Sequence, residues 1–168
     1  GEDARTQSFR LTTAGQRLIE KARPAWERAQ TRAREILGRF ATRAYRRPAT
    51  PSEIERLVAF VPRARTNGDS FELAIKSACT AVMVSPHFLF RGELQPDPDN
   101  PRSVHPVDEF ALASRLSYFL WSTMPDEALF RLASEGKLRK NLDAQVRRML
   151  KDPRSDALDR KSTRLNSS

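Results

Sequence analysis

Cysteine and histidine are scarce in this chain of 168 residues, which contains one cysteine and two histidines. The lone Cys79 cannot form an internal disulfide, and the C-x-x-C-H motif that attaches a c-type haem is absent. His87 and His105 lie 18 positions apart, which is not the ligand spacing of a metal site. The sequence therefore predicts no cofactor-binding and no metal-ligating residue in this chain.

Glycine is also rare, with six residues scattered along the chain. There is no glycine-rich loop of the kind that cradles phosphate, and no G-x-S-x-G turn that would present a serine nucleophile. The carboxylate pairs Asp108/Glu109 and Asp126/Glu127 stand at predicted helix starts, where capping and the helix dipole account for them. No catalytic motif is found, and the sequence leaves open whether the protein is an enzyme.

Long apolar runs and alternating strand patterns are both missing. No stretch approaches the roughly 20 apolar residues that span a bilayer, so no membrane span is expected. Apolar residues instead recur every three or four positions, which is the period of a helix with one buried face. We expect an all-α protein with two small helical subdomains, about six helices and no sheet.

Prolines and polar stretches divide the chain into five parts. Residues 1–24 are expected to be a poorly ordered lead-in, and residues 25–94 a first domain of three helices. Residues 95–104 hold three prolines and form the expected linker, followed by the N-terminal part of a second helical domain at 105–158. The last ten residues, 159–168, are similar to translated sequencing-adaptor DNA and are expected to be non-native.

Capping residues and prolines place the helix ends within these parts. The apolar pattern predicts a first helix from Ala25 to about Tyr45. Thr50-Pro51-Ser52-Glu53 is typical of a capping box and predicts a second helix that ends near Pro62. The fourth helix is expected to carry Pro106 in its first turn. Its body is apolar on nearly all sides, so it should be the most buried element of the second domain.

Positive charge is concentrated in the first third of the chain. Residues 1–50 hold twelve Lys or Arg against five Asp or Glu, whereas residues 51–100 hold five against seven. Clustered positive charge attracts phosphate, an anionic membrane surface or an acidic partner. The simpler interpretation is a solvated helix face, because Glu20, Glu27 and Glu35 are interspersed at helical spacing.

Two arginine-bearing helix ends supply the candidate structural or interface residues. Arg46 and Arg47 follow the first helix and complement the negative end of its dipole, with contact to a partner domain as the alternative. Arg115 interrupts an apolar helix, and a buried guanidinium needs a carboxylate, for which Asp126 or Asp108 would serve. We expect a structural ion pair there, with binding of an anion or substrate as the alternative. The same segment, R-L-S-Y-F-L-W-S-T-M-P-D, adds to the candidates Tyr118, Trp121 and Asp126.

Three blocks of the sequence resemble one family of proteins. They are A-T-R-A-Y-R-R-P-A-T-P-S-E-I-E-R-L at Ala41–Leu57, S-P-H-F-L-F-R-G-E at Ser85–Glu93, and E-F-A-L-A-S-R-L-S-Y-F-L-W-S-T-M-P-D-E-A-L at Glu109–Leu129. Their order is similar to that in large bacterial proteins abundant in planctomycetes and verrucomicrobia. Those proteins are strings of domains of unknown function that are often accompanied by a c-type cytochrome domain.

The resemblance implies a longer exported parent protein, located in the periplasm or at the cell surface, with any haem in a separate domain. It implies no catalytic residue for this chain. The expected function is a non-catalytic helical scaffold or docking fragment whose partners are the other domains of the parent, the cytochrome domain among them. Two alternatives stay open: one wall of an enzyme active site completed by missing domains and, least favoured, a basic nucleic-acid-binding protein.

Overall fold

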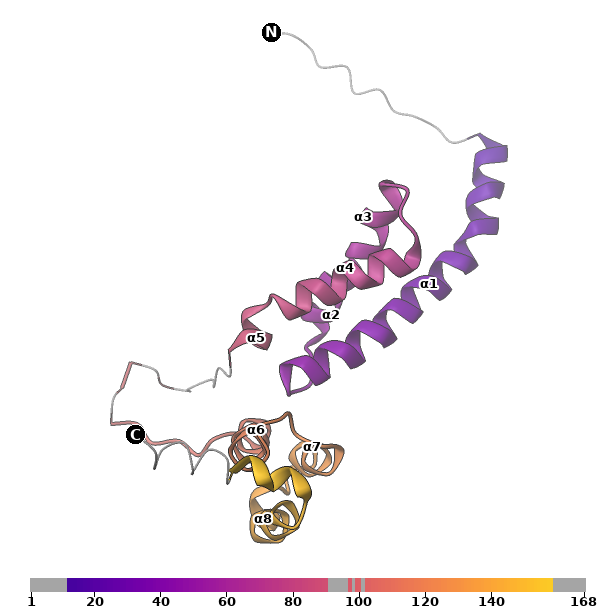
Figure 1. Ribbon diagram of the computed structural model, residues 1–168. Helices are drawn as coiled ribbons and strands as arrows, with labels where there is room; N and C mark the ends of the chain where they lie inside the picture. Colours follow the sequence, from indigo (N-terminus) through magenta and orange to yellow (C-terminus); the bar gives the residue numbers. More distant parts are fainter. Residues whose placement is uncertain (1–11, 91–96, 98, 101, 159–168) are drawn as a thin grey trace.

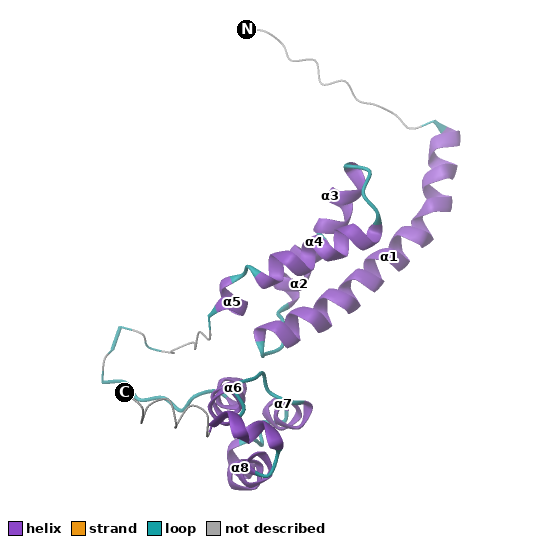
Figure 2. Ribbon diagram, in the orientation of Figure 1, coloured by secondary structure: helices purple, strands orange, loops and turns teal. Residues whose placement is uncertain are grey.

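The computed structural model describes residues 12–90, 97, 99–100 and 102–158 (Figure 1). Over these residues the chain forms eight α-helices and two short 3-10 helices, without any strand (Figure 2). The all-α prediction is confirmed, although the α-helices outnumber those expected. None of the helices in this part of the chain is long and apolar enough to cross a membrane.

Helix α1, Thr13–Tyr45, is the longest element and begins well before the expected start at Ala25. The hydroxyl of Thr12 accepts a hydrogen bond from the Gly15 amide at 3.2 Å and caps the helix. Pro24 lies inside α1, where it removes one backbone hydrogen bond without ending the helix. The C-terminal half of α1 is stabilised by tertiary packing, and extending the helix from there costs less than starting a new one, so the helix continues through Pro24 despite the missing hydrogen bond. The interpretation of Pro24 as a boundary was therefore wrong, and the lead-in is helical from Thr13 onward.

Helix α2, Pro51–Val58, begins with the capping box that the sequence predicts. The Glu53 amide donates to the hydroxyl of Thr50 at 3.3 Å, and the Thr50 amide donates to a carboxylate oxygen of Glu53 at 2.7 Å. Two backbone donors at the start of the helix are satisfied in this way.

A proline divides the second expected helix in two. Helix α2 ends at Val58, because Pro62 has no N–H to donate to the Val58 carbonyl. The next helix, α3, spans Phe60–Thr66 and holds Pro62 in its first turn, where no donor is required. The expected helix end near Pro62 was wrong, because this proline belongs to the start of a helix.

Two further helices complete the first unit. Helix α4, Phe71–Met83, is capped by Ser70, whose hydroxyl accepts from the Leu73 amide at 3.1 Å. It is followed by the short α5, Pro86–Leu89. Alanines let α1 and α4 approach closely in the core, which is formed by Ala33, Leu37, Ala41, Ala44, Tyr45, Leu57, Val58, Val61, Ala74, Ala78 and Val82.

The second unit has its own core. Its helices are α6, Glu109–Leu120, α7, Glu127–Ser134, and α8, Leu142–Leu150, with 3-10 turns at Arg139–Asn141 and Pro153–Ser155. Larger side chains fill this core, namely Leu120, Trp121, Leu129, Leu138 and Met149, together with Ala113 and Ala133. No residue of this core belongs to the first one, so the described chain folds around two separate centres.

Helix α6 departs from the expectation in two respects. Its N-cap is Asp108, so Pro106 precedes the helix and does not stand in its first turn. Only one face of α6 is buried, because Phe119 on the opposite side is 64% exposed. The apolar sequence of α6 therefore led us to expect more burial than the structure shows.

One exposed ion pair connects the two units, between Arg43 of α1 and Glu127 of α7. Figure 1 shows the C-terminal end of α1 lying close to α6 and α7. Residues 95, 96, 98 and 101 of the expected linker, residues 1–11 of the lead-in and the whole expected non-native tail, 159–168, lie outside the described residues.

Candidate functional site

The residue after α1 has a backbone conformation that is unusual for an arginine. Arg46 has a φ of 59°, in the left-handed region, and its N–H donates to the Arg43 carbonyl at 3.2 Å. Glycine most often fills this position at a helix end because it has no Cβ. Placing an arginine here costs about 1 kcal/mol of backbone strain, which other contacts must offset.

The side chain of Arg46 offsets this strain by binding the backbone around α5. Its Nη2 atom contacts the carbonyl oxygens of His87 at 3.0 Å, Phe88 at 3.2 Å and Phe90 at 3.0 Å. Carbonyls at the end of a helix have no partner within it, and the buried guanidinium supplies one. Arg46 is therefore a structural clamp between the ends of α1 and α5.

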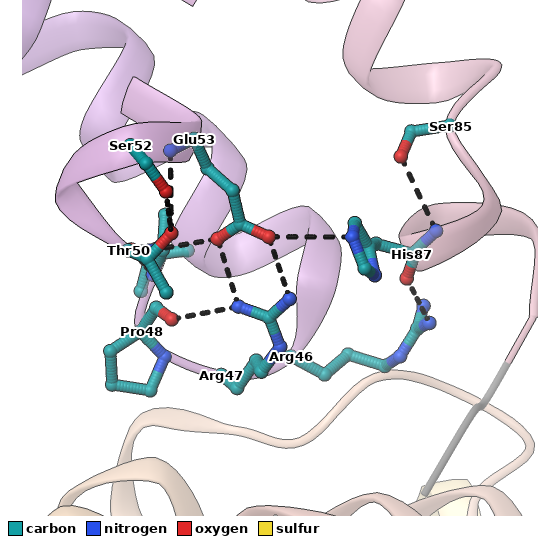
Figure 3. Close-up of polar contacts among 10 residues, drawn as sticks. Arg46, Arg47, Pro48, Thr50, Ser52, Glu53, Ser85 and His87 are labelled. Carbon is teal, nitrogen blue, oxygen red and sulfur yellow. Dashed lines mark hydrogen bonds and ion pairs between the residues drawn. The ribbon is translucent and has the colours of Figure 1, made fainter. Parts of the chain in front are cut away.

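Arg47 and Glu53 form a two-point ion pair beside this clamp (Figure 3). Nη1 of Arg47 lies 3.0 Å from Oε2 of Glu53, and Nη2 lies 2.8 Å from Oε1. Hydrogen bonds from Arg47 lower the pKa of the buried Glu53 carboxyl to about 2, although burial by itself would raise it. The same pairing raises the pKa of Arg47. A carboxylate that the sequence assigned only to helix capping thus also anchors the segment between α1 and α2.

His87 and Tyr45 complete this side of the site. His87 Nε2 lies 3.4 Å from Oε1 of Glu53, and its ring meets that of Tyr45 edge-on with centroids 5.2 Å apart. The guanidinium carbon of Arg47 stands 5.5 Å from the centroid of the same tyrosine ring. Sequence reasoning missed Tyr45, Glu53 and His87 as neighbours. The only available signal was their presence in the blocks that carry the family resemblance.

The first turn of α6 lies on the opposite side of the candidate site from Arg46, Arg47 and His87. Oδ1 of Asp108 accepts from the amides of Phe110 and Ala111, each at 2.9 Å, which fixes the first turn. The ring of Phe110 lies 5.3 Å from that of Phe130, centroid to centroid, and so is held against the second unit.

These two sides enclose a cleft of about 730 Å³. Its lining from the first unit is Tyr45, Arg46, Arg47, Pro86, His87 and Phe90, and its lining from the second is Asp108, Phe110, Ala111, Ser114 and Arg115. The volume falls within the range of small-molecule sites. Three arginines and one aspartate are among the lining residues, and one of the arginines, Arg47, is already paired with Glu53. The remaining positive charge and the three aromatic carbocycles of the lining suit a ligand that joins an anionic group to a flat apolar one. We refer to this space as the inter-unit cleft.

Arg115 lines the inter-unit cleft and is not part of a core. Because the residue is exposed, the expectation of a buried guanidinium was wrong: α6 buries one face, and Arg115 is not on it. Asp126, one of its two expected partners, is paired with Arg148 at 2.7 and 3.2 Å. Burial raises the pKa of Asp126, but hydrogen bonds from Arg148 and the Leu129 amide outweigh this and lower it.

The remaining candidates belong to the second unit away from the cleft lining. Trp121 is buried, and its Nε1 donates to the Met149 carbonyl at 3.0 Å. The guanidinium carbon of Arg154 lies 3.6 Å from the centroid of the Trp121 ring system. Tyr118 is half-buried on α6. The structure therefore brings Arg46, Arg47 and Arg115 together at one site and places Tyr118, Trp121 and Asp126 outside it.

Groups suited to metal binding or nucleophilic attack are few in the part of the chain that the structure describes. No three His, Cys, Asp or Glu side chains cluster there in a way that could hold a metal ion. Burial raises the pKa of the Cys79 thiol, which disfavours the nucleophilic thiolate. Cys79 packs against the first core and does not line the cleft.

Each helical unit matches one family model. Residues 32–93 match PSD5, a protein of unknown function (DUF1595), and residues 107–164 match PSD4, a protein of unknown function (DUF1592). The expected resemblance to a string of domains of unknown function is confirmed to that extent. The second match runs to residue 164, into the segment expected to be non-native. The chain matches no curated protein and no solved structure.

Proposed function

We propose that this chain is a non-catalytic docking module of a larger exported protein, and that the inter-unit cleft receives a c-type cytochrome domain. The observation that carries the proposal is the convergence of Arg46, Arg47 and Arg115 on one cleft between two separately packed units. The cytochrome partner and the periplasmic or cell-surface location come from the sequence resemblance.

The chemistry of haem fits this lining. A haem edge combines two carboxylates with a flat apolar ring, and arginine forms strong two-point bonds to carboxylates while aromatic rings cover apolar surface. Arg46 and Arg47 are already fixed by the His87 carbonyl and by Glu53. They would therefore contribute a fixed positive potential to the cleft, and the exposed Arg115 would make the direct contact with a haem carboxylate.

A direct test measures how a c-type haem peptide with free propionates binds to the full chain. The change in haem absorbance reports the binding. Arg115→Gln should weaken binding about tenfold, the size expected when one charged hydrogen bond is lost. Arg131→Gln is the matched control, because Arg131 is exposed on α7 and does not line the cleft.

Two results would contradict the proposal in different ways. Absence of haem-peptide binding by the unaltered chain would exclude the haem edge as the docked group. Equal binding by the Arg115→Gln and Arg131→Gln proteins would place the contact outside the inter-unit cleft. Thermal unfolding of both variants verifies that neither change acts through the fold.

A second candidate function, one wall of an enzyme active site, draws support from the contact between His87, which lines the cleft, and the buried Glu53 beside it. A carboxylate can orient an imidazole as a general base or nucleophile. If this is its role, His87→Gln should slow the hydrolysis of p-nitrophenyl acetate by the full chain, whereas His105→Gln should not. Equal rates in the two variants would remove this candidate.

A further inference from the structure

The inter-unit cleft contains one histidine among its described lining residues, His87. Histidine is the side chain that ordinarily gains or loses its charge between pH 5 and pH 8. The chain has a second histidine, His105, but it lies outside this lining. Near neutral pH the charge of the cleft can therefore change at His87.

The backbone of His87 is held in place while its side chain stays accessible (Figure 3). The His87 amide donates to the hydroxyl of Ser85 at 3.3 Å, and its carbonyl accepts from Nη2 of Arg46 at 3.0 Å. The side chain is 52% exposed, so solvent and a ligand in the cleft can both reach the ring. The contact with Arg46 uses only the backbone of His87, so it survives a change of the side chain.

Glu53 provides a charged partner for a protonated His87. Nε2 of His87 lies 3.4 Å from Oε1 of Glu53. Hydrogen bonds from Arg47 lower the pKa of Glu53 to about 2, so this carboxylate is ionised throughout the range in which histidine titrates. A hydrogen bond between two charged groups is stronger than one from a neutral donor. The ring of Tyr45, edge-on to the imidazole at 5.2 Å, packs against His87 from α1.

The other charged or titratable groups around α5 come from the end of α1, from α4 and from the start of α6. They are Arg46 and Arg47, then Glu72, Lys76 and Cys79, then Asp108 and Arg115. Glu72 and Lys76 form an ion pair at 3.0 Å and cancel each other. Burial raises the pKa of the Cys79 thiol, which keeps it neutral. Helix α4 therefore adds no net charge beside His87.

Protonation of His87 doubles the net positive charge around the cleft. The three lining arginines are opposed by two carboxylates, that of Asp108 in the lining and that of Glu53 beside it. One positive charge remains when His87 is neutral, and two remain when it is protonated. A second charge within the same cleft attracts an anion and repels a cation at short range.

We propose that His87 makes the binding of anions in the inter-unit cleft dependent on pH, with tighter binding in mildly acidic solution. This inference rests on the proposed function, because it requires the cleft to accept a flat ligand with an anionic group. It adds a form of regulation, in which acid favours docking and alkali weakens it. By linkage, a bound anion favours the protonated form of His87 to the same extent.

The test uses pyrene-1-sulfonate, which joins a flat apolar ring system to an anion that stays ionised in this range. Its fluorescence reports binding to the full chain at about pH 5.5 and about pH 8, at constant ionic strength. The unaltered chain should bind it about fivefold more tightly at the lower pH, the size expected for one added charge at a partly exposed site. The cation 1-pyrenemethylammonium has the same ring system and should bind more weakly at the lower pH.

Three variants separate the charge of His87 from its other contacts. His87→Gln removes the titrating group and should bind the sulfonate equally at the two pH values. His87→Lys carries a cation at both pH values and should also lose the pH dependence, but with the tighter binding. His105→Gln is the matched control and should keep the fivefold difference, because His105 does not line the cleft. Thermal unfolding at both pH values verifies that each variant keeps its fold.

A fourth variant places the probe in the cleft. Arg115→Gln should weaken binding of the sulfonate at both pH values and leave their ratio unchanged, because it removes a cation of the lining that does not titrate here. If this change has no effect, the probe binds elsewhere and the assignment to the cleft is wrong.

The outcomes distinguish this inference from docking itself. Equal sulfonate binding by the unaltered chain at the two pH values, or a pH dependence that persists in His87→Gln, would overturn the role of His87. Tighter binding of both pyrene probes in acid would overturn it too, because it would indicate newly exposed apolar surface. Absence of sulfonate binding at either pH would remove the anion site altogether. Sulfonate binding with the expected pH dependence, but without haem-peptide binding, would support the role of His87 and contradict the docking function.

Discussion

The two ends of α1 use basic residues in opposite ways. At the C-terminal end, Arg43 pairs with Glu127, Arg46 binds backbone carbonyls and Arg47 pairs with Glu53. At the N-terminal end, Arg17, Lys21 and Arg28 are exposed and take part in no ion pair with the described part of the chain. Charge that is counted equally in the sequence forms structural contacts at one end of the helix and is exposed to solvent at the other.

Burial explains why the two ends differ. A guanidinium removed from water must find acceptors, and Arg46 and Arg47 are held at the point where α1, α2 and α5 meet. Within the part of the chain that the structure describes, the cations Arg17, Lys21 and Arg28 in the N-terminal half are exposed, so water solvates them. We therefore expect substitutions at the C-terminal end to change stability, and substitutions of the exposed cations at the N-terminal end to leave it nearly unchanged.

The largest effect is expected from Arg46→Ala. This change leaves the three carbonyls around α5 without their donor and keeps a Cβ in a left-handed backbone, so the free energy of unfolding should fall by about 3 to 4 kcal/mol. Urea unfolding of the full chain measures it. Arg46→Gly serves as the matched variant and should recover up to about 1 kcal/mol, since glycine adopts this backbone without strain. Equal urea midpoints for the unaltered and alanine proteins would show that the clamp contributes nothing.

The Glu53 carboxylate should make the structural end of α1 sensitive to acid. Its pKa is lowered from 4.5 to about 2 in the folded protein, so its contribution is complete above pH 4.5 and is lost as the pH falls toward 2. Between about pH 6 and about pH 3 the unaltered chain should lose about 2 kcal/mol more stability than Glu53→Gln. Urea unfolding at both pH values measures this difference. Parallel losses in the two proteins would mean that other carboxylates govern the acid response.

Helix starts and core faces were predictable because they depend on residues close together in sequence. The Thr50 and Glu53 capping box, the Ser70 cap and the left-handed Gly136 each follow from local donors, acceptors or backbone freedom. The buried face of α4 follows from helical spacing alone. Pro24 shows the limit of such signals, because tertiary packing farther along α1 decides whether a proline ends the helix.

The inter-unit cleft could be predicted only in part. Arg46, Arg47 and Arg115 were named from the sequence as interface candidates, but their convergence required the two units to be placed relative to each other. Spacing gives no reason to pair His87 with Glu53, which lie 34 residues apart. The expected burial of Arg115 failed because an apolar helix can still leave one face in solvent.

A smaller effect is expected for the ion pair between Arg43 and Glu127, although it connects the two units. Both side chains are largely exposed, so their coupling free energy in a double-mutant cycle with alanine should stay below about 1 kcal/mol and decrease with salt. Urea unfolding of the four proteins provides the cycle. A coupling well above this value would mean that the two units depend on this contact, and the structural end of α1 would then reach into the second unit.

The smallest effect on stability is expected at the opposite end of α1, and it completes the comparison. Replacing Arg17, Lys21 and Arg28 together by alanine removes three exposed cations that have no structural partner, so the free energy of unfolding should change by less than about 0.5 kcal/mol. Alanine also favours helix slightly more than arginine or lysine. A loss of stability comparable to that of Arg46→Ala would show that these cations have structural partners too. An unchanged urea midpoint would show that this row of charge contributes nothing to folding, in contrast to the arginines at the other end of the helix.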